Sequence, residues 1–213
     1  MKPLLLVLAF TSSFVALGAA DATPAKPSTG STAKLDSRVA TVDRAPIWQS
    51  ELDEAFAHAG LKTPTKEQTE LALDSLVDSL IVDHAADALR LEVSDAEVDM
   101  AIAEIKKQNN IDDAGLDKAL GDQHFTRAMY RVELARQVRA QKLFQIELVP
   151  HVAVSEDELK AYYAKRKAAD PGVDTFEKVH DTLKQILWGD KMAAEQDAWI
   201  KRKRATAHIV RKP

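Results

Sequence analysis

The chain has 213 residues, of which 46% are hydrophobic and 29% charged, and its formal net charge is -4. This apolar content is sufficient for a folded core, and charges of nearly balanced sign are typical of a solvated surface rather than of a nucleic-acid-binding protein. Cysteine is absent, which excludes disulfide bonds, thiol catalysis and thiolate metal sites. The 7 glycines and 6% aromatic residues favour a mostly α fold over a glycine-rich β fold.

The N-terminus has the pattern of an export signal. Lys2 precedes the apolar run LLLVLAFTSSFVAL, which the small residues of GAADAT follow. A positive charge, an apolar stretch and a small-residue cleavage site together predict a signal peptide over residues 1–20. An uncleaved membrane anchor is the alternative. Residues 21–37 are rich in Pro, Ser, Thr and Ala, and this composition predicts a disordered linker.

Two short runs have the pattern of strands. RVATV, residues 38–42, alternates apolar and polar side chains, and ATAHIV, residues 205–210, is the other strand-like segment. A single strand is not stable without a partner. We therefore expect these two runs to pair in a small two-stranded sheet. The pairing would close residues 38–213 into a single domain.

The sequence between these runs predicts helices throughout. Four helix starts are marked by a hydroxyl residue followed three positions later by an acid or an amide. On the helix expected over residues 125–147, Leu134, Val138 and Phe144 are predicted to face inward, and further helices are expected around residues 116–120, with Gly121 as the stop, and over residues 176–204. The four marked starts are Ser50–Asp53, Thr65–Gln68, Ser94–Glu97 and Ser155–Glu158.

No pattern of catalytic or cofactor-binding residues is found. None of the 6 histidines has a neighbour at metal-ligand spacing, and no P-loop, GxGxxG or GxSxG motif occurs. We therefore expect no catalytic residue, no metal site, no cofactor and no nucleotide. Residues 201–212 hold six Lys or Arg and no acid, which is compatible with binding to anionic lipid or nucleic acid. Because aromatic interleaving is missing, we interpret these cations as stabilising the end of the last helix.

Several segments resemble the SurA-type periplasmic chaperones. RVATVDRAPIWQSELD resembles the opening of that family, and LRLEVSDAEVDMAIAEIKKQNNIDDAGLDKAL resembles its most recognisable stretch. VAVSEDELKAYY resembles the segment that leads out of the helical domain, and the run from Phe176 to Val210 resembles the helix and strand that return to it. The resemblance covers residues 38–168 and 175–211, and it implies a SurA N-terminal-type helical domain.

The resemblance also implies a function. In this family, parvulin-type prolyl isomerase domains lie between the leaving and the returning segments, but here only AADPGVDT, residues 168–175, connects them. The resemblance therefore implies a chaperone that binds unfolded outer-membrane or secreted polypeptides in the periplasm and has no isomerase activity. Stable membrane insertion is not expected after signal cleavage. The alternatives are an adaptor that binds one specific partner through the same helical surface and, less favoured, a prolyl isomerase.

Adaptable apolar side chains are the candidates for client binding. Polarisable methionines and flat aromatic rings re-pack around different sequences, which suits a surface that binds many polypeptides. For each candidate, an ordinary core position is the alternative. The resemblance places Trp199 in the core, because its DAWI context faces the returning strand in the family. The candidates are Met100, Phe125, Met129, Tyr130 and Trp188.

Overall fold

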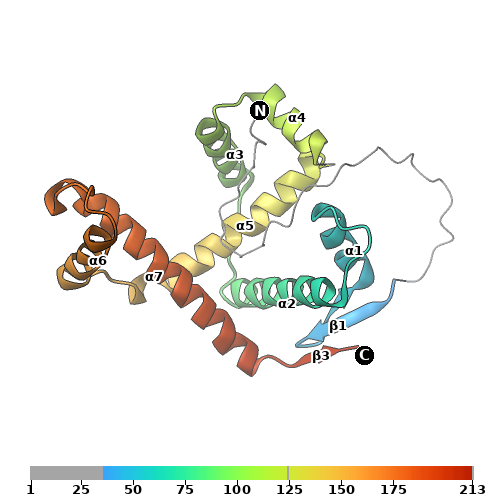
Figure 1. The fold of residues 1–213 in the computed structure, drawn as a ribbon. Coiled ribbons are helices and arrows are strands. Elements are labelled where there is room, and N and C mark those ends of the chain that lie inside the picture. Colours follow the sequence, from blue (N-terminus) through green and yellow to red (C-terminus); the bar gives the residue numbers. More distant parts are fainter. Residues whose placement is uncertain (1–35, 124, 213) are drawn as a thin grey trace.

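The computed structural model describes residues 36–123 and 125–212 and shows a mostly helical fold (Figure 1). The expected signal peptide, residues 1–20, lies outside the described residues, as does all of the expected linker except Asp36 and Ser37. The elements are β1 Arg38–Val42, β2 Ala45–Trp48, α1 Gln49–His58, α2 Lys66–Ala88, α3 Asp95–Asn109, α4 Asp113–Asp122, α5 Arg127–Glu147, η1 Val149–His151, α6 Glu156–Ala169, α7 Phe176–Thr206 and β3 Ile209–Arg211.

The sheet joins the two ends of the folded part, as predicted. Strand β1 lies in the middle and pairs antiparallel with β3, where Thr41 lies opposite Val210. The sheet has a third strand that was not predicted, because β2 contains Pro46, which cannot donate to a ladder and indicates a turn. Asp43 and Arg44 join β1 to β2 with φ values of 49° and 77°, as in a tight hairpin turn.

Two predicted boundaries were wrong near the C-terminus and in α4. Residues 205 and 206 continue α7 instead of starting a strand, so β3 is limited to residues 209–211. Alanine favours the helix, and Arg204 fixes this last turn by hydrogen bonds to Asp74 and Asp78 of α2. Gly121 does not end α4, which runs on to Asp122.

Three of the four predicted helix caps are confirmed. The hydroxyls of Thr65, Ser94 and Ser155 each accept a hydrogen bond from the backbone N–H three residues later. The fourth prediction was wrong, because α1 begins at Gln49 directly after β2. There Trp48 takes the cap position, where its backbone N–H donates to Glu51 at 2.7 Å. The Ser50 hydroxyl instead donates to Asp36.

Most of the buried side chains form three clusters, and α5 passes through two of them. The largest lies between the inner face of the sheet, α2, the C-terminal half of α5 and Trp199 of α7. The second lies between α3, α4 and the N-terminal half of α5, and we call these elements the α3–α5 lobe. The third joins α1 to α2. As predicted, Leu134, Phe144 and Trp199 are buried, whereas Val138 is half-buried.

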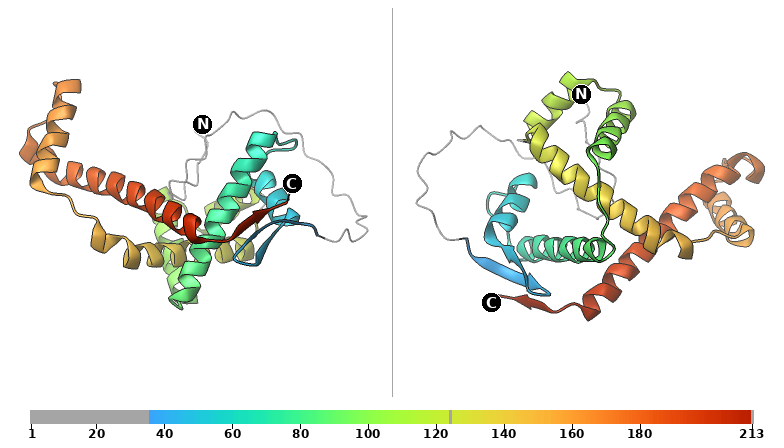
Figure 2. Two further views of the ribbon diagram at one scale, coloured as in Figure 1. Left: turned by 90° about the horizontal axis from the view of Figure 1, so that it is seen from below. Right: turned by 180° about the vertical axis from the view of Figure 1, so that it is seen from behind.

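Helix α6 packs against the N-terminal part of α7 to form a hairpin that extends from the rest of the molecule (Figure 2), and we call it the arm. Leu159 and Leu183 are buried in it. The connection between its helices is a compact turn, because Lys167 Nζ donates to the Pro171 carbonyl at 2.9 Å and the Tyr163 hydroxyl to the Asp174 carbonyl at 3.0 Å. The place where the resemblance puts an inserted domain is therefore a closed helical hairpin.

Candidate functional site

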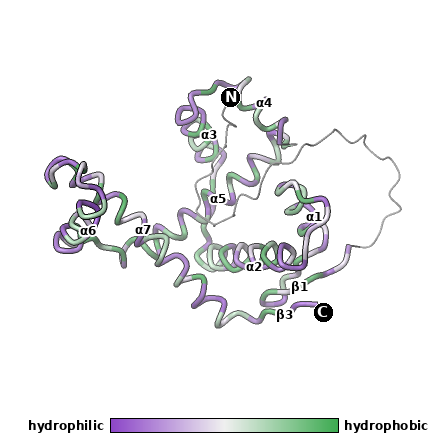
Figure 3. Tube along the Cα trace, in the orientation of Figure 1, coloured by the Kyte–Doolittle hydropathy of each residue, from purple (hydrophilic) through white to green (hydrophobic). Residues whose placement is uncertain are grey.

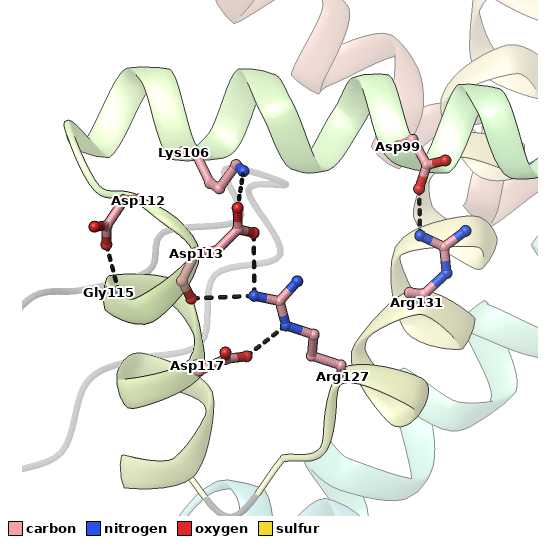
Figure 4. Close-up of polar contacts among 8 residues, drawn as sticks. All are labelled: Asp99, Lys106, Asp112, Asp113, Gly115, Asp117, Arg127 and Arg131. Carbon is pink, nitrogen blue, oxygen red and sulfur yellow. Dashed lines mark hydrogen bonds and ion pairs between the residues drawn. The ribbon is translucent and has the colours of Figure 1, made fainter.

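Ion pairs between neighbouring helices fix the α3–α5 lobe (Figure 4). Lys106 of α3 contacts Asp113 of α4 at 3.1 Å, and Arg127 of α5 donates to the carboxylate and the carbonyl of the same Asp113 at 3.1 Å. Arg127 also pairs with Asp117. The hydrogen bonds from Lys106 and Arg127 hold the pKa of Asp113 below its ordinary value. Helix α4 is therefore tied to both α3 and α5 by charge as well as by the buried cluster.

The contact between α3 and α5 is reinforced in the same way. Arg131 pairs with Asp99 and with Asp95, the latter at 3.2 Å. Lys142 pairs with Glu97, and this bond together with those from Ser94 lowers the pKa of Glu97 to about 2. Glu97 therefore stays ionised at any physiological pH. These pairs add to the buried cluster that joins α3 to α5.

Figure 3 shows how apolar residues are distributed along this framework. Apolar and polar segments alternate along the helices, so that each helix has faces of both kinds. One apolar face of a helix packs into the core, and any apolar residue on another face stays in contact with water. Several large apolar residues of the helices are exposed, among them Met100, Met129 and Trp188.

The five candidate residues do not form a single patch. Met100 of α3, Met129 of α5 and Trp188 of α7 are exposed, by 64%, 40% and 41%. Phe125 is half-buried, and its ring stacks on His58 of α1 with centroids 4.3 Å apart. Tyr130 is only 3% exposed and belongs to the buried cluster of the lobe, so the core alternative holds for it in this conformation. Met100 and Met129 lie on the lobe, whereas Trp188 lies on α7.

Sequence reasoning missed Val132, which is 72% exposed on α5. It lies one helical turn after Met129, and residues three apart are neighbours on a helix surface. The i,i+3 spacing was the available signal. Spacing alone does not tell which face of α5 is turned to solvent, because that depends on where α3 and α4 pack.

Two comparisons relate the chain to known proteins. Residues 1–144 match the SurA-like N-terminal domain family. The chain belongs to this family. It is 28% identical to Chaperone SurA of Chromobacterium violaceum over 169 residues, which cover 75% of this chain and 37% of that protein. It is 26% identical to Chaperone SurA of Methylobacillus flagellatus over 157 residues, which cover 70% and 36%. The chain thus spans little more than a third of the length of these relatives.

A comparison of structures found a SurA-like chaperone of Campylobacter jejuni with 19% identity, which covers 62% of this chain and 51% of that one at a TM-score of 0.48. Within this chain, the family match ends in α5 at Phe144. Later residues pack against the matched part of the chain, since Trp199 of α7 lies edge-on to Phe144 with ring centroids 5.5 Å apart. Helix α7 and strand β3 thus contact the matched segment, through Trp199 and through the pairing of β3 with β1.

Metal and membrane sites were also sought. In residues 36–123 and 125–212, no group of three or more His, Cys, Asp or Glu side chains is placed to hold a metal ion. Within the same ranges, the helices are too short or too polar for any of them to cross a bilayer. His84 Nδ1 lies 4.0 Å from the Asp43 carboxylate and so links α2 to the β1–β2 turn.

Replacing Tyr130 by Phe should stabilise the protein. The Tyr130 hydroxyl is buried and has no hydrogen-bond partner among the described residues, and burial raises its pKa. An unsatisfied buried hydroxyl costs about 1–3 kcal/mol, so its removal should raise the free energy of unfolding by about 1 kcal/mol in urea titrations. Tyr163→Phe is the matched control, and it should be neutral or destabilising because its hydroxyl donates to Asp174. A destabilised Y130F variant would show that the Tyr130 hydroxyl has a partner in solution.

Proposed function

We propose that this SurA-like protein is a periplasmic chaperone that holds unfolded outer-membrane or secreted polypeptides and has no catalytic activity. The observation that carries the proposal is the exposure of large apolar side chains on a framework fixed by ion pairs. Met100, Met129 and Val132 are exposed on α3 and α5, the same two helices that Arg131 ties together. Because the buried cluster, aided by these ion pairs, holds α3 and α5 together, these side chains stay available to a client.

The chemistry of this surface suits many clients rather than one. Methionine is flexible and polarisable, and an apolar contact has no directional requirement, so different sequences bind with similar affinity. The surrounding Asp, Lys and Arg side chains keep the chaperone soluble. The clients are unfolded or partly folded polypeptides, and binding requires no nucleotide and no nucleic acid. Export by a signal peptide over residues 1–20 would bring the protein to the periplasm.

The chaperone function predicts suppression of aggregation. The purified protein should reduce light scattering by an unfolded outer-membrane protein without nucleotide, with an affinity on the order of micromolar, because ordering a flexible client offsets much of the gain from burial. Binding should persist at high salt, since apolar burial is not screened. The double variant Met129→Ser, Val132→Ser should lose most of this activity and keep its circular dichroism spectrum, since both side chains are exposed.

Leu71→Ser is the matched control for this experiment. Leu71 is an exposed apolar residue of α2, outside the α3–α5 lobe, and its replacement should leave suppression unchanged. Equal activity of the double variant and the wild type would remove Met129 and Val132 from the client surface. A wild-type protein that ignores every unfolded client but captures one folded partner would instead support the adaptor function.

The absence of isomerase activity is a separate expectation. It is supported by the compact connection over residues 170–175, at the position where the resemblance places an isomerase domain. In a protease-coupled assay with a proline peptide, isomerisation should proceed at the uncatalysed rate, over tens to hundreds of seconds. An acceleration that follows the protein through every purification step would contradict the proposal.

A further inference from the structure

The outer face of the three-stranded sheet is partly exposed and carries both apolar and basic side chains. Side chains alternate between the two faces of a strand, and Ala40, Val42 and Ile47 point into the core. Thr41 and its direct partner Val210 therefore lie on the opposite face, where Val210 is 48% exposed. An open hollow of about 570 Å³ lies over this face, and its lining includes Arg38, Thr41, Trp48, Val210 and Lys212.

Strand β3 forms one edge of this sheet. It pairs only with β1 among the strands of the described chain. The Lys212 N–H donates to the Val39 carbonyl at 2.9 Å, and the Asp43 N–H donates to the His208 carbonyl at 3.0 Å. Because hydrogen-bonded pairs alternate along an antiparallel ladder, the backbone groups of Ile209 and Arg211 point away from β1. These groups are a template for one more strand.

The charged side chains that line the hollow are all positive. Its lining includes three cations, Arg38, Arg211 and Lys212, and no acid. Arg211 is paired with Asp74 of α2. Arg38 and Lys212 form no ion pair within the described residues. The hollow is thus complementary to an apolar group accompanied by a carboxylate.

We propose that β3 and this hollow bind an extended segment of a client polypeptide, which adds as a fourth strand beside β3. The backbone of the segment would pair with Ile209 and Arg211. Its apolar side chains would extend over Val210 towards the hollow, and an acidic residue at its end would contact Lys212 or Arg38. The inference rests on the proposed chaperone function, and it adds the conformation and the charge of the preferred client segment.

Recognition by strand addition restricts the conformation of the client segment, which apolar contact alone does not. Main-chain hydrogen bonds supply much of the affinity in this mode of recognition, while side chains on alternate positions supply the specificity. The segment must therefore be extended, with apolar residues at every second position. Such a pattern is typical of β-strands that have one buried face. A helical or collapsed client segment would not fit this edge.

A labelled synthetic peptide tests this proposal. A peptide of about ten residues with alternating valine and threonine and with aspartate at each end is long enough to form one strand. Its fluorescence anisotropy should report saturable binding to the purified chain. N-methylation of alternate backbone amides should abolish binding, because it removes the donors that pair with β3. Val210→Glu should weaken binding about tenfold or more, since it places a carboxylate under the apolar side chains of the peptide.

Two controls accompany Val210→Glu. Ile146→Glu makes the same change at an exposed apolar residue near the end of α5 that belongs neither to the hollow nor to the client surface proposed above, and peptide affinity should remain within about twofold of the wild type. Lys212→Glu should weaken binding of the aspartate-ended peptide, and a lysine-ended peptide should recover the lost affinity. If Lys212→Glu weakened binding only by disturbing the fold, reversing the charge on the peptide would not restore the affinity.

The outcomes separate this inference from the chaperone function. If the wild type suppresses aggregation but peptide binding is absent or insensitive to V210E and N-methylation, the strand site is refuted and the chaperone function stands. If the peptide binds as described but aggregation is not suppressed, the strand site stands and the chaperone function fails. Dimers in sedimentation that depend on Val210, with no peptide binding, would assign the edge to a second copy of the chain and overturn the proposal.

Discussion

Deletion of residues 205–213 should destabilise the entire helical domain, with a loss of about 3–5 kcal/mol in the free energy of unfolding. The deletion removes β3, so β1 loses the ladder on one side, including the pairs of Thr41 and Val42 with Val210 and Ile209. It also removes the ion pair between Arg211 and Asp74. Because β1 contributes buried side chains to the largest cluster, the loss should spread to α2 and α5. Urea titration followed by helical circular dichroism measures this effect.

A shorter deletion serves as the control for this experiment. Removing only residues 212 and 213 leaves β3 intact and takes away the hydrogen bond from the Lys212 N–H to Val39, so about 1 kcal/mol or less should be lost. A chain without residues 205–213 that unfolds at the same urea concentration as the full chain would show that the two ends are not one unit.

Replacing Arg204 by Ala should lower the free energy of unfolding by about 2 kcal/mol at neutral pH. This is less than for a fully buried ion pair, because Arg204 and its partners Asp74 and Asp78 are partly exposed. Arg204 is the link between α7 and α2. Its guanidinium donates to the Asp74 carboxylate at 2.7 Å and to the Asp74 carbonyl at 3.0 Å, and it also pairs with Asp78. Without Arg204, two half-buried carboxylates one helical turn apart would lose this shared partner.

The pKa values of the two carboxylates give this loss a specific pH dependence. Burial raises the pKa of Asp78 above its ordinary value despite the bond from Arg204. Burial acts in the same direction on Asp74, but Arg204 and Arg211 together lower its pKa below the ordinary value. In the wild type, Asp74 therefore contributes stability that is present at neutral pH and is lost as the pH falls through its folded pKa, whereas ionisation of Asp78 costs stability above its own pKa.

In the Arg204→Ala variant, both pKa values should rise, because burial remains and the lowering contacts of Arg204 are gone. The deficit in stability should be largest at neutral pH and should shrink below about pH 4, where protonation removes the unpaired charges. Urea titrations of the wild type and the variant, at neutral pH and at a pH below about 4, measure this deficit. Arg202→Ala is the matched control, since Arg202 is exposed and pairs only with Glu195 among the described residues, so its loss should be small at both pH values. A deficit that is equal at both pH values would mean that Arg204 acts by packing alone.

The sequence by itself was sufficient for features that depend on local hydrogen bonds. Thr65, Ser94 and Ser155 cap their helices because the hydroxyl and the N–H that it accepts from are three residues apart, so no distant residue is needed. The alternation in residues 38–42 predicted β1, and the lack of another strand-like run predicted its pairing with the C-terminal end. The mostly helical fold and the resemblance to the SurA family followed from the order of these elements.

The tertiary structure decided which apolar residues of the helices are buried. Met129 and Tyr130 are adjacent in α5 and were equal candidates, yet only Met129 is exposed, because α3 and α4 cover the face that carries Tyr130. Where α3 packs on α5 depends on contacts such as those of Arg131 with Asp95 and Asp99, which are over 30 residues away in the chain.

The sheet was likewise completed by tertiary contacts. Strand β2 contains a proline and so has a weak local signal, but it is held in place because Ile47 is buried in the main cluster and its backbone pairs with β1. The end of α7 was set by Arg204 reaching Asp74 and Asp78, which are more than 120 residues away in the sequence. Caps and alternation are properties of neighbouring residues and can be identified in the sequence. Burial, edges and hollows arise only when distant segments pack, because exposure of a side chain depends on what lies against it.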